Sequence, residues 1–187
     1  MKVLLIDNYD SFTYNIVHYL YSFTENITVI KNDEIENKFY DYDAIIISPG
    51  PGLPSESGNL MNFIENHFTQ IKILGICLGM QALAFFTHKN SLFNLKKVKH
   101  GIQEPIFILE KSDILFKDLP KSLNVGLYHS WAVNDDIENE WFITSKNKEN
   151  INMSIKNKKY PIWGVQFHPE SIMTENGKQI IKNFLFS

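Results

Sequence analysis

The chain has 187 residues, of which 44% are hydrophobic and 21% are charged; this is ordinary globular usage and excludes disordered and fibrous classes. The net charge of −3 at pH 7 predicts no basic surface for nucleic acid or anionic lipid, so neither is expected as a partner. No run approaches the ~20 apolar residues that a membrane-spanning helix needs, and no membrane association is expected.

The start of the chain has the pattern of a first strand rather than of an export signal. Its apolar run covers only residues 3–6 before Asp7, whereas a signal peptide carries a longer apolar segment. The chain contains one cysteine, Cys77, so no intramolecular disulfide can form. Both features favour the reducing cytoplasm as the location of the protein.

In the first half of the chain, short β-branched runs alternate with helical patterns, as in parallel strands joined by helices. Strands are predicted at 3–6, 27–30, 44–47 and 71–74. Helical spacing of apolar residues predicts helices over 12–23, 60–68 and from 79 to 86. Asp10 or Ser11 is expected to cap the first of these helices.

After residue 89 the pattern changes to strands and turns. Strands are predicted at 106–109, 125–128, 142–145, 151–155 and 162–167, before a closing helix around 180–185. No repeat or linker marks a second domain, so residues 1–187 are expected to form a single domain. The predicted fold class is α/β, with an open, mostly parallel central sheet, helices on both faces, and antiparallel strands added at the edge.

Gly75-Ile76-Cys77-Leu78-Gly79 has the glycine-x-nucleophile-x-glycine form of a nucleophile elbow, and it lies between a predicted strand and a predicted helix. The glycines permit a tight turn, while the amino terminus of the helix favours the ionised thiol. The Leu78 N–H would then be free to face an oxyanion. A lone cysteine can also pack as a small buried hydrophobe, but the flanking glycines favour the nucleophile.

His168-Pro169-Glu170 follows a predicted strand. Proline disfavours the α region for the residue before it, so His168 is expected to be extended. Glu170 can then orient the imidazole, either directly or by bending back, while the imidazole acts as base and acid for Cys77. The other interpretation of the tripeptide is a surface His-Glu pair at the end of a strand.

Ser48-Pro49-Gly50-Pro51-Gly52 follows a central strand, at the sheet edge where open α/β folds bind ligands. Its glycines allow close approach of the backbone to a ligand, so the loop can supply a second oxyanion donor. A rigid turn and a phosphate cradle are alternative interpretations, although the Lys-Ser/Thr ending of a P-loop is missing.

The remaining histidines are expected to be ordinary surface or packed residues. They show no metal-ligand spacing, so neither a metal nor another cofactor is expected. These residues are His18, His67, His88, His100 and His129.

Taken together, the motifs resemble a known family. Over essentially its whole length the chain is similar to the glutaminase subunit of anthranilate synthase and of aminodeoxychorismate synthase, which are class I, triad-type glutamine amidotransferases. The opening motif resembles the chorismate-linked branch, and the cysteine and histidine motifs are shared across the class. The five motifs are DNYDSFTYN at 7–15, SPGPG at 48–52, GICLGMQ at 75–81, YHS at 128–130 and GVQFHPES at 164–171.

The resemblance implies a role for each of these positions. Cys77 would be the nucleophile, His168 the acid and base, and Glu170 the residue that orients it. The substrate would be L-glutamine, and a larger chorismate-binding synthase subunit would be the partner that receives the ammonia. The residues implied to hold glutamine and its oxyanion are Gly50, Pro51, Gly52, Leu78, Gln81, Ser130 and Trp131.

The sequence departs from the family pattern at two positions, and three alternative functions remain open. The family usually has histidine where Met80 stands and often has leucine where Trp131 stands. The alternatives are a glutaminase subunit of another class I amidotransferase, a cysteine hydrolase or peptidase on the same fold, and a phosphate- or nucleotide-binding module in which Cys77 is structural. The sequence does not separate the anthranilate branch from the aminodeoxychorismate branch.

Overall fold

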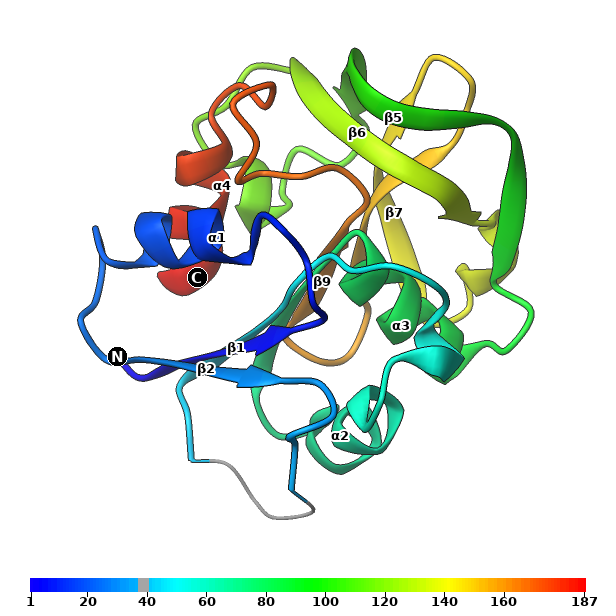
Figure 1. Cartoon of the computed structure of the whole chain (residues 1–187). Helices are drawn as coiled ribbons and strands as arrows, with labels where there is room; N and C mark the ends of the chain where they lie inside the picture. The colour runs from blue at the N-terminus through cyan, green and yellow to red at the C-terminus, as the bar shows by residue number, and fades with distance from the viewer. Residues whose placement is uncertain (37–40) are drawn as a thin grey trace.

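The computed structural model describes residues 1–36 and 41–187, and its strands form one mixed sheet beside four α-helices (Figure 1). Within these residues the strands are β1 (Val3–Asp7), β2 (Ile27–Lys31), β3 (Ala44–Ile47), β4 (Lys72–Ile76), β5 (Leu92–Ile108), β6 (Ser122–Val133), β7 (Trp141–Asn147), β8 (Asn152–Asn157) and β9 (Ile162–Val165). The helices are α1 (Thr13–Leu20), α2 (Leu60–His67), α3 (Leu78–Thr87) and α4 (Gly177–Leu185).

The sheet has a parallel part and an antiparallel part. Its spatial order is β2-β1-β3-β4-β9-β8-β7-β5-β6. The strands from β2 to β9 in that order are parallel to one another, and β8, β7, β5 and β6 continue the sheet by antiparallel pairing. The predicted α/β fold class, with antiparallel strands added to a parallel sheet, is therefore confirmed.

The central strands β3 and β9 are apolar throughout, and β1 and β4 are apolar except at one end, because both faces of this part of the sheet are covered. Successive side chains of a strand point to opposite faces, so Leu5 and Ile46 enter the core shared with α1 and α4. Their neighbours Leu4 and Ile45 enter the second core, shared with α2 and α3. Figure 1 shows the two helix pairs on opposite sides of the sheet. Within the described part of the chain, no helix has the length and apolar character needed to cross a membrane.

Strand β5 is much longer than predicted, because it begins at Leu92 and the sequence indicates only its end at 106–109. Its pairing with β6 shifts register twice, and Gly101 at the second shift has φ +66°. Such bulges break the alternation of apolar and polar residues on which a strand prediction depends. The buried Lys99 also points inward, where its ammonium pairs with Glu104 and Glu149.

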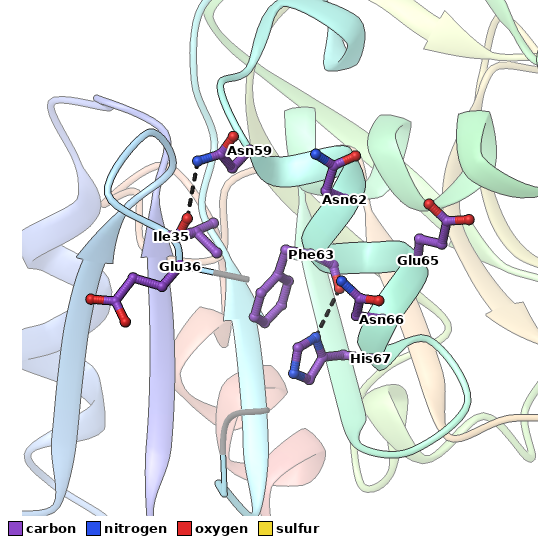
Figure 2. A pocket seen from close by; sticks show the side chains of 8 residues that line it. All are labelled: Ile35, Glu36, Asn59, Asn62, Phe63, Glu65, Asn66 and His67. Carbon is purple, nitrogen blue, oxygen red and sulfur yellow. Dashed lines mark hydrogen bonds between the residues drawn. The ribbon is translucent and has the colours of Figure 1, made fainter. Parts of the chain in front are cut away.

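A hollow of about 520 Å³ lies beside α2 and contains none of the residues predicted to carry chemistry (Figure 2). Asn59 Nδ2 donates to the Ile35 carbonyl at 3.0 Å on one side of it. On the other side the His67 ring stacks on Phe63, and His67 Nδ1 contacts the Phe63 carbonyl oxygen at 2.9 Å. His67 is thus a packed histidine, as expected from the sequence.

The core of the parallel sheet gives a direct test of this packing. Ile46 is fully buried in the central strand β3, so Ile46→Ala should lower the free energy of unfolding by about 2–5 kcal/mol. Urea denaturation followed by circular dichroism measures the change. Tyr14→Ala is the control: the Tyr14 side chain is 71% exposed, and its loss should change stability by only about 0.5 kcal/mol. Equal effects of the two substitutions would contradict the assigned core.

Candidate active site

Cys77 lies at a sharp bend between β4 and α3. Its backbone has φ +51° and ψ −103°, a region that residues other than glycine rarely occupy. The bend is held from both sides, since the Cys77 N–H donates to the Val165 carbonyl at 2.7 Å and the Cys77 carbonyl accepts from the Gln81 N–H at 3.0 Å. The side chain is buried, but the residue lines a pocket. The predicted elbow is therefore present.

The glycines that flank Cys77 are required by close contacts between backbones. A Cβ at Gly75 would lie 2.4 Å from the Gly79 carbonyl carbon, and a Cβ at Gly79 would lie 2.5 Å from the Ile47 carbonyl oxygen. Backbone atoms cannot swing away as a flexible side chain can. Gly75 and Gly79 therefore let the start of α3 sit directly on β3 and β4, which fixes the position of the sulfur.

His168 and Glu170 are both buried and form a close pair, with His168 Nδ1 2.7 Å from Glu170 Oε1. The carboxylate reaches the ring by a turn, since the Ser171 N–H donates to the His168 carbonyl at 3.1 Å. The same carbonyl also accepts from Thr174 Oγ1 at 2.5 Å. Of the two routes that the sequence left open, the chain therefore takes the one in which Glu170 bends back.

The imidazole of His168 is set between aromatic rings and carries a raised pKa. The Tyr128 and Phe12 rings approach it edge-on, with centroids 4.8 and 6.3 Å away. Burial lowers the pKa of His168, but the interactions with Cys77 and with the Glu170 carboxylate outweigh it and raise the pKa to about 10. His168 Nε2 has no hydrogen-bond partner of normal geometry among the described residues, which leaves this nitrogen available for proton transfer.

The 48–52 loop is fixed by hydrogen bonds to the end of β1. The Asn8 N–H donates to Ser48 Oγ, and Asn8 Nδ2 donates to the Ser48 carbonyl, both at 2.8 Å. A Cβ at Gly50 would lie 2.5 Å from Asn8 Cβ and 2.9 Å from Leu78 Cδ2. The loop therefore passes against Leu78, the first residue of α3.

One pocket of about 430 Å³ contains Cys77, His168, Gly50 and Pro51. Its other walls are residues that were not individually predicted to bind or react with a ligand, and most of them come from elements that only the fold brings together. His100 was expected to be an ordinary histidine, yet it lines this pocket beside the bulge at Gly101, and bulges often re-aim side chains near active sites. These other lining residues are Tyr9, Asp10, Ser11, Phe12, Pro49, His100 and Tyr128.

The segment leading into α1 forms part of this wall and departs from the predicted capping. The helix begins after Phe12, which has no side-chain cap. The Asp10 side chain does not cap the helix; its Oδ2 accepts from the N–H of Phe12, the residue before the first helical residue, at 2.7 Å. Asp7 Oδ1 accepts from Thr13 Oγ1 at 2.7 Å. Burial raises the pKa of Asp10.

Five of the residues implied to hold glutamine and its oxyanion do not line this pocket. Gln81 is nevertheless joined to Trp131, since its Nε2 donates to the Trp131 carbonyl at 2.9 Å. Gln81 Nε2 also donates to Gln166 Oε1 at 3.1 Å, and Gln166 Nε2 donates to Cys77 Sγ at 3.4 Å. No role was predicted for Gln166, because in the sequence it resembles an ordinary residue of a strand. The five residues outside the pocket are Gly52, Leu78, Gln81, Ser130 and Trp131.

The two departures from the family pattern lie in different settings. Met80 is fully buried, and its side chain fills the space in front of Gly164, where a Cβ would lie 2.7 Å from Met80 Cγ. Trp131 contributes its backbone carbonyl, which also contacts His129 Nδ1 at 2.8 Å. The Met80 side chain therefore belongs to the core, and the Trp131 interactions do not depend on its indole.

His129 is a packed histidine beside the site. Burial lowers the pKa of His129 to about 4, assisted by the charge of His168 and opposed by the hydrogen bond to Trp131. Across residues 1–36 and 41–187, no group of three or more His, Cys, Asp or Glu side chains is arranged to hold a metal ion.

Comparison with known proteins places these features in a family. The sequence pattern of the family described as glutamine amidotransferase class-I matches residues 4–187. Anthranilate synthase component 2 of Cyanophora paradoxa is 39% identical over 188 residues, covering 98% of this chain and 97% of that protein. Aminodeoxychorismate/anthranilate synthase component 2 of Bacillus subtilis is 38% identical over 187 residues, covering 98% and 95%. A crystal structure of a Thermoplasma acidophilum protein has a TM-score of 0.88 at 23% identity, covering 100% and 92%, and bears on the fold alone.

The pair of His168 and Glu170 predicts a pH-dependent stability. A histidine whose folded pKa is raised from 6.5 to about 10 adds stability that is fully present below pH 6.5 and is lost as the pH rises through about 10. Glu170→Gln keeps the shape of the side chain but removes its charge, so the pKa of His168 should fall. The excess stability of the native protein over this variant should therefore be largest near neutral pH and shrink towards pH 10.

Urea denaturation of both proteins over this pH range measures that difference. Glu175→Gln is the control, because Glu175 is a surface carboxylate that stays ionised throughout and binds Asn124. The difference in the free energy of unfolding between Glu175→Gln and the native protein should stay constant with pH. If the difference in unfolding free energy between the native protein and Glu170→Gln is also constant with pH, the assigned charge of His168 is contradicted.

Proposed function

Since this chain belongs to the class-I glutamine amidotransferase family, we propose that it is the glutaminase subunit of a chorismate-using synthase. It hydrolyses glutamine to glutamate and ammonia and passes the ammonia to a larger synthase subunit. The observation that carries the proposal is a single pocket lined by Cys77, at a positive-φ bend, and by His168, whose ring is paired with the buried Glu170. Such a constellation has the parts that a covalent acyl-transfer reaction requires.

The first half of the reaction forms a thioester. The Cys77 thiolate attacks the carbon of the glutamine side-chain amide, and the negative charge moves to the amide oxygen. The Leu78 N–H, which has no partner within the first turn of a helix, and a loop amide near Gly52 stabilise this oxyanion. The contact of the loop with Leu78 at Gly50 supports this assignment, because it places the loop against the first residue of α3.

His168 controls the protons of both half-reactions. Its pKa of about 10 means that the ring holds a proton at neutral pH beside the thiolate. It gives this proton to the leaving nitrogen, and ammonia departs as the C–N bond breaks. The neutral ring then takes a proton from water, and the hydroxide attacks the thioester, releasing glutamate and restoring the thiolate. Glu170 holds the ring in place throughout.

The partner and the location extend this proposal. Relatives in Cyanophora paradoxa and Bacillus subtilis carry the names of second components of anthranilate and aminodeoxychorismate synthases, which supports a larger chorismate-binding first component as the partner here. One free cysteine is suited to a reducing compartment, so the proposed location is the cytoplasm. The proposed functional unit is one domain spanning residues 1–187, with L-glutamine as its substrate.

Replacing the nucleophile tests the reaction itself. Cys77→Ser should lower glutamine hydrolysis by roughly 10³-fold or more, because the remaining groups act only as a unit with the thiol. Glutamate release in the presence of the synthase subunit measures the loss. The circular dichroism spectrum and unfolding midpoint should stay close to native, and a folded variant that still hydrolyses glutamine would refute the proposal.

Reconstitution identifies the reaction that is served. The native chain, mixed with its co-purifying larger subunit, chorismate and glutamine, should form anthranilate or aminodeoxychorismate, which chromatography distinguishes. The Cys77→Ser protein should support the same product only when free ammonia is added. Failure of glutamine, but not ammonia, to support the product with the native chain would contradict its role as ammonia supplier.

A further inference from the structure

Gln166 lies immediately after β9, two residues before His168, and is fully buried. Its backbone is fixed by the hydrogen bond from its N–H to the Met153 carbonyl at 2.9 Å. The side chain therefore has a defined direction, towards Cys77 rather than towards solvent. Its amide contacts the sulfur on one side, at 3.4 Å, and Gln81 on the other, at 3.1 Å.

The direction of these hydrogen bonds follows from the Trp131 carbonyl. A carbonyl oxygen can only accept, so the Gln81 group that faces it must be the NH₂. That NH₂ also faces Gln166, so Gln166 must present its oxygen to Gln81 and its NH₂ to the sulfur. Turning either amide round would place two acceptors or two donors against each other. The relay from Trp131 through Gln81 and Gln166 therefore ends in an N–H donor at Cys77.

We infer that Gln166 is a positioning residue for the reaction, whose side-chain amide donates a hydrogen bond to the Cys77 sulfur and favours the thiolate. A donor to the charged form of a group stabilises that form. Gln81, a proposed contact of glutamine, would then have a second task, which is to hold the Gln166 amide in the donating orientation. This inference rests on the proposed function, because it takes Cys77 as the nucleophile.

Two substitutions of Gln166 test the donor. Gln166→Leu keeps a similar size and removes the donor, so alkylation of Cys77 by iodoacetamide at pH 7 should slow about tenfold, as expected for a hydrogen bond to a charged group. The alkylation profile should move to higher pH, so that the native rate returns in alkali. Gln166→Glu puts an acceptor-only carboxylate against the sulfur and should move the profile further in the same direction.

Turnover gives a second measurement. With the synthase subunit present, Gln166→Leu should lower kcat for glutamine hydrolysis by about tenfold, while KM changes less. Asn152→Leu is the matched control, since Asn152 is also a buried amide, with its Nδ2 bound to Val133 and Asp135. This control should reduce stability, yet leave the alkylation profile of Cys77 unchanged.

A folded Gln166→Leu protein with the native alkylation profile would overturn the inference. If that variant does not fold, Gln81→Met provides the test, because the Gln166 amide then loses the hydrogen bond that orients it. The pH profile of Cys77 alkylation should move in the same direction by a smaller amount. An unchanged profile would overturn the inference. Alkylation needs no glutamine. A native protein that fails to hydrolyse glutamine would therefore refute the proposed function without affecting the test of Gln166.

Discussion

The structure depends on one strained backbone position, the bend at Cys77. A positive φ at a residue with a side chain persists only when its surroundings enforce it, and here they do so at several points. The Cys77 N–H and carbonyl are both hydrogen-bonded, and Gly75 and Gly79 let α3 approach the sheet at backbone distance. The bend places the sulfur beyond the end of β4 and at the amino terminus of α3, in the pocket that His168 also lines.

The order of the strands explains how distant segments reach this sulfur. β4 and β9 are parallel neighbours with Ile76 opposite Val165. The segments that follow these two strands therefore leave the sheet side by side, at the carboxyl ends of the strands. Cys77 follows one strand, and Gln166 and His168 follow the other. The antiparallel strands complete the site from the far side, because β6 carries Tyr128 against the imidazole and the Trp131 carbonyl against Gln81. The mixed sheet thus builds one site from both of its parts.

The features that were predicted from sequence and are present in the structure are set by local chemistry: the parallel strands, the tight turn between Gly75 and Gly79, and the pairing of His168 with Glu170. The missed features depend on contacts between distant segments. Most of β5 was not predicted, because its bulges and the inward-facing Lys99 break the alternation of apolar and polar residues that marks a strand. His100 acquires its place in the pocket only through the pairing of β5 with β6, and Gln166 looks like an ordinary strand residue until the fold brings it to Cys77.

The covalent intermediate is the most direct test of the central claim. The native protein and its synthase subunit are mixed with glutamine, quenched in acid within one turnover, and digested for mass spectrometry. We expect a glutamyl thioester on the peptide that contains Cys77, and we expect it to decay as glutamate forms. Glutamate formation without that adduct under conditions that preserve thioesters, or with an adduct on another residue, would contradict the account.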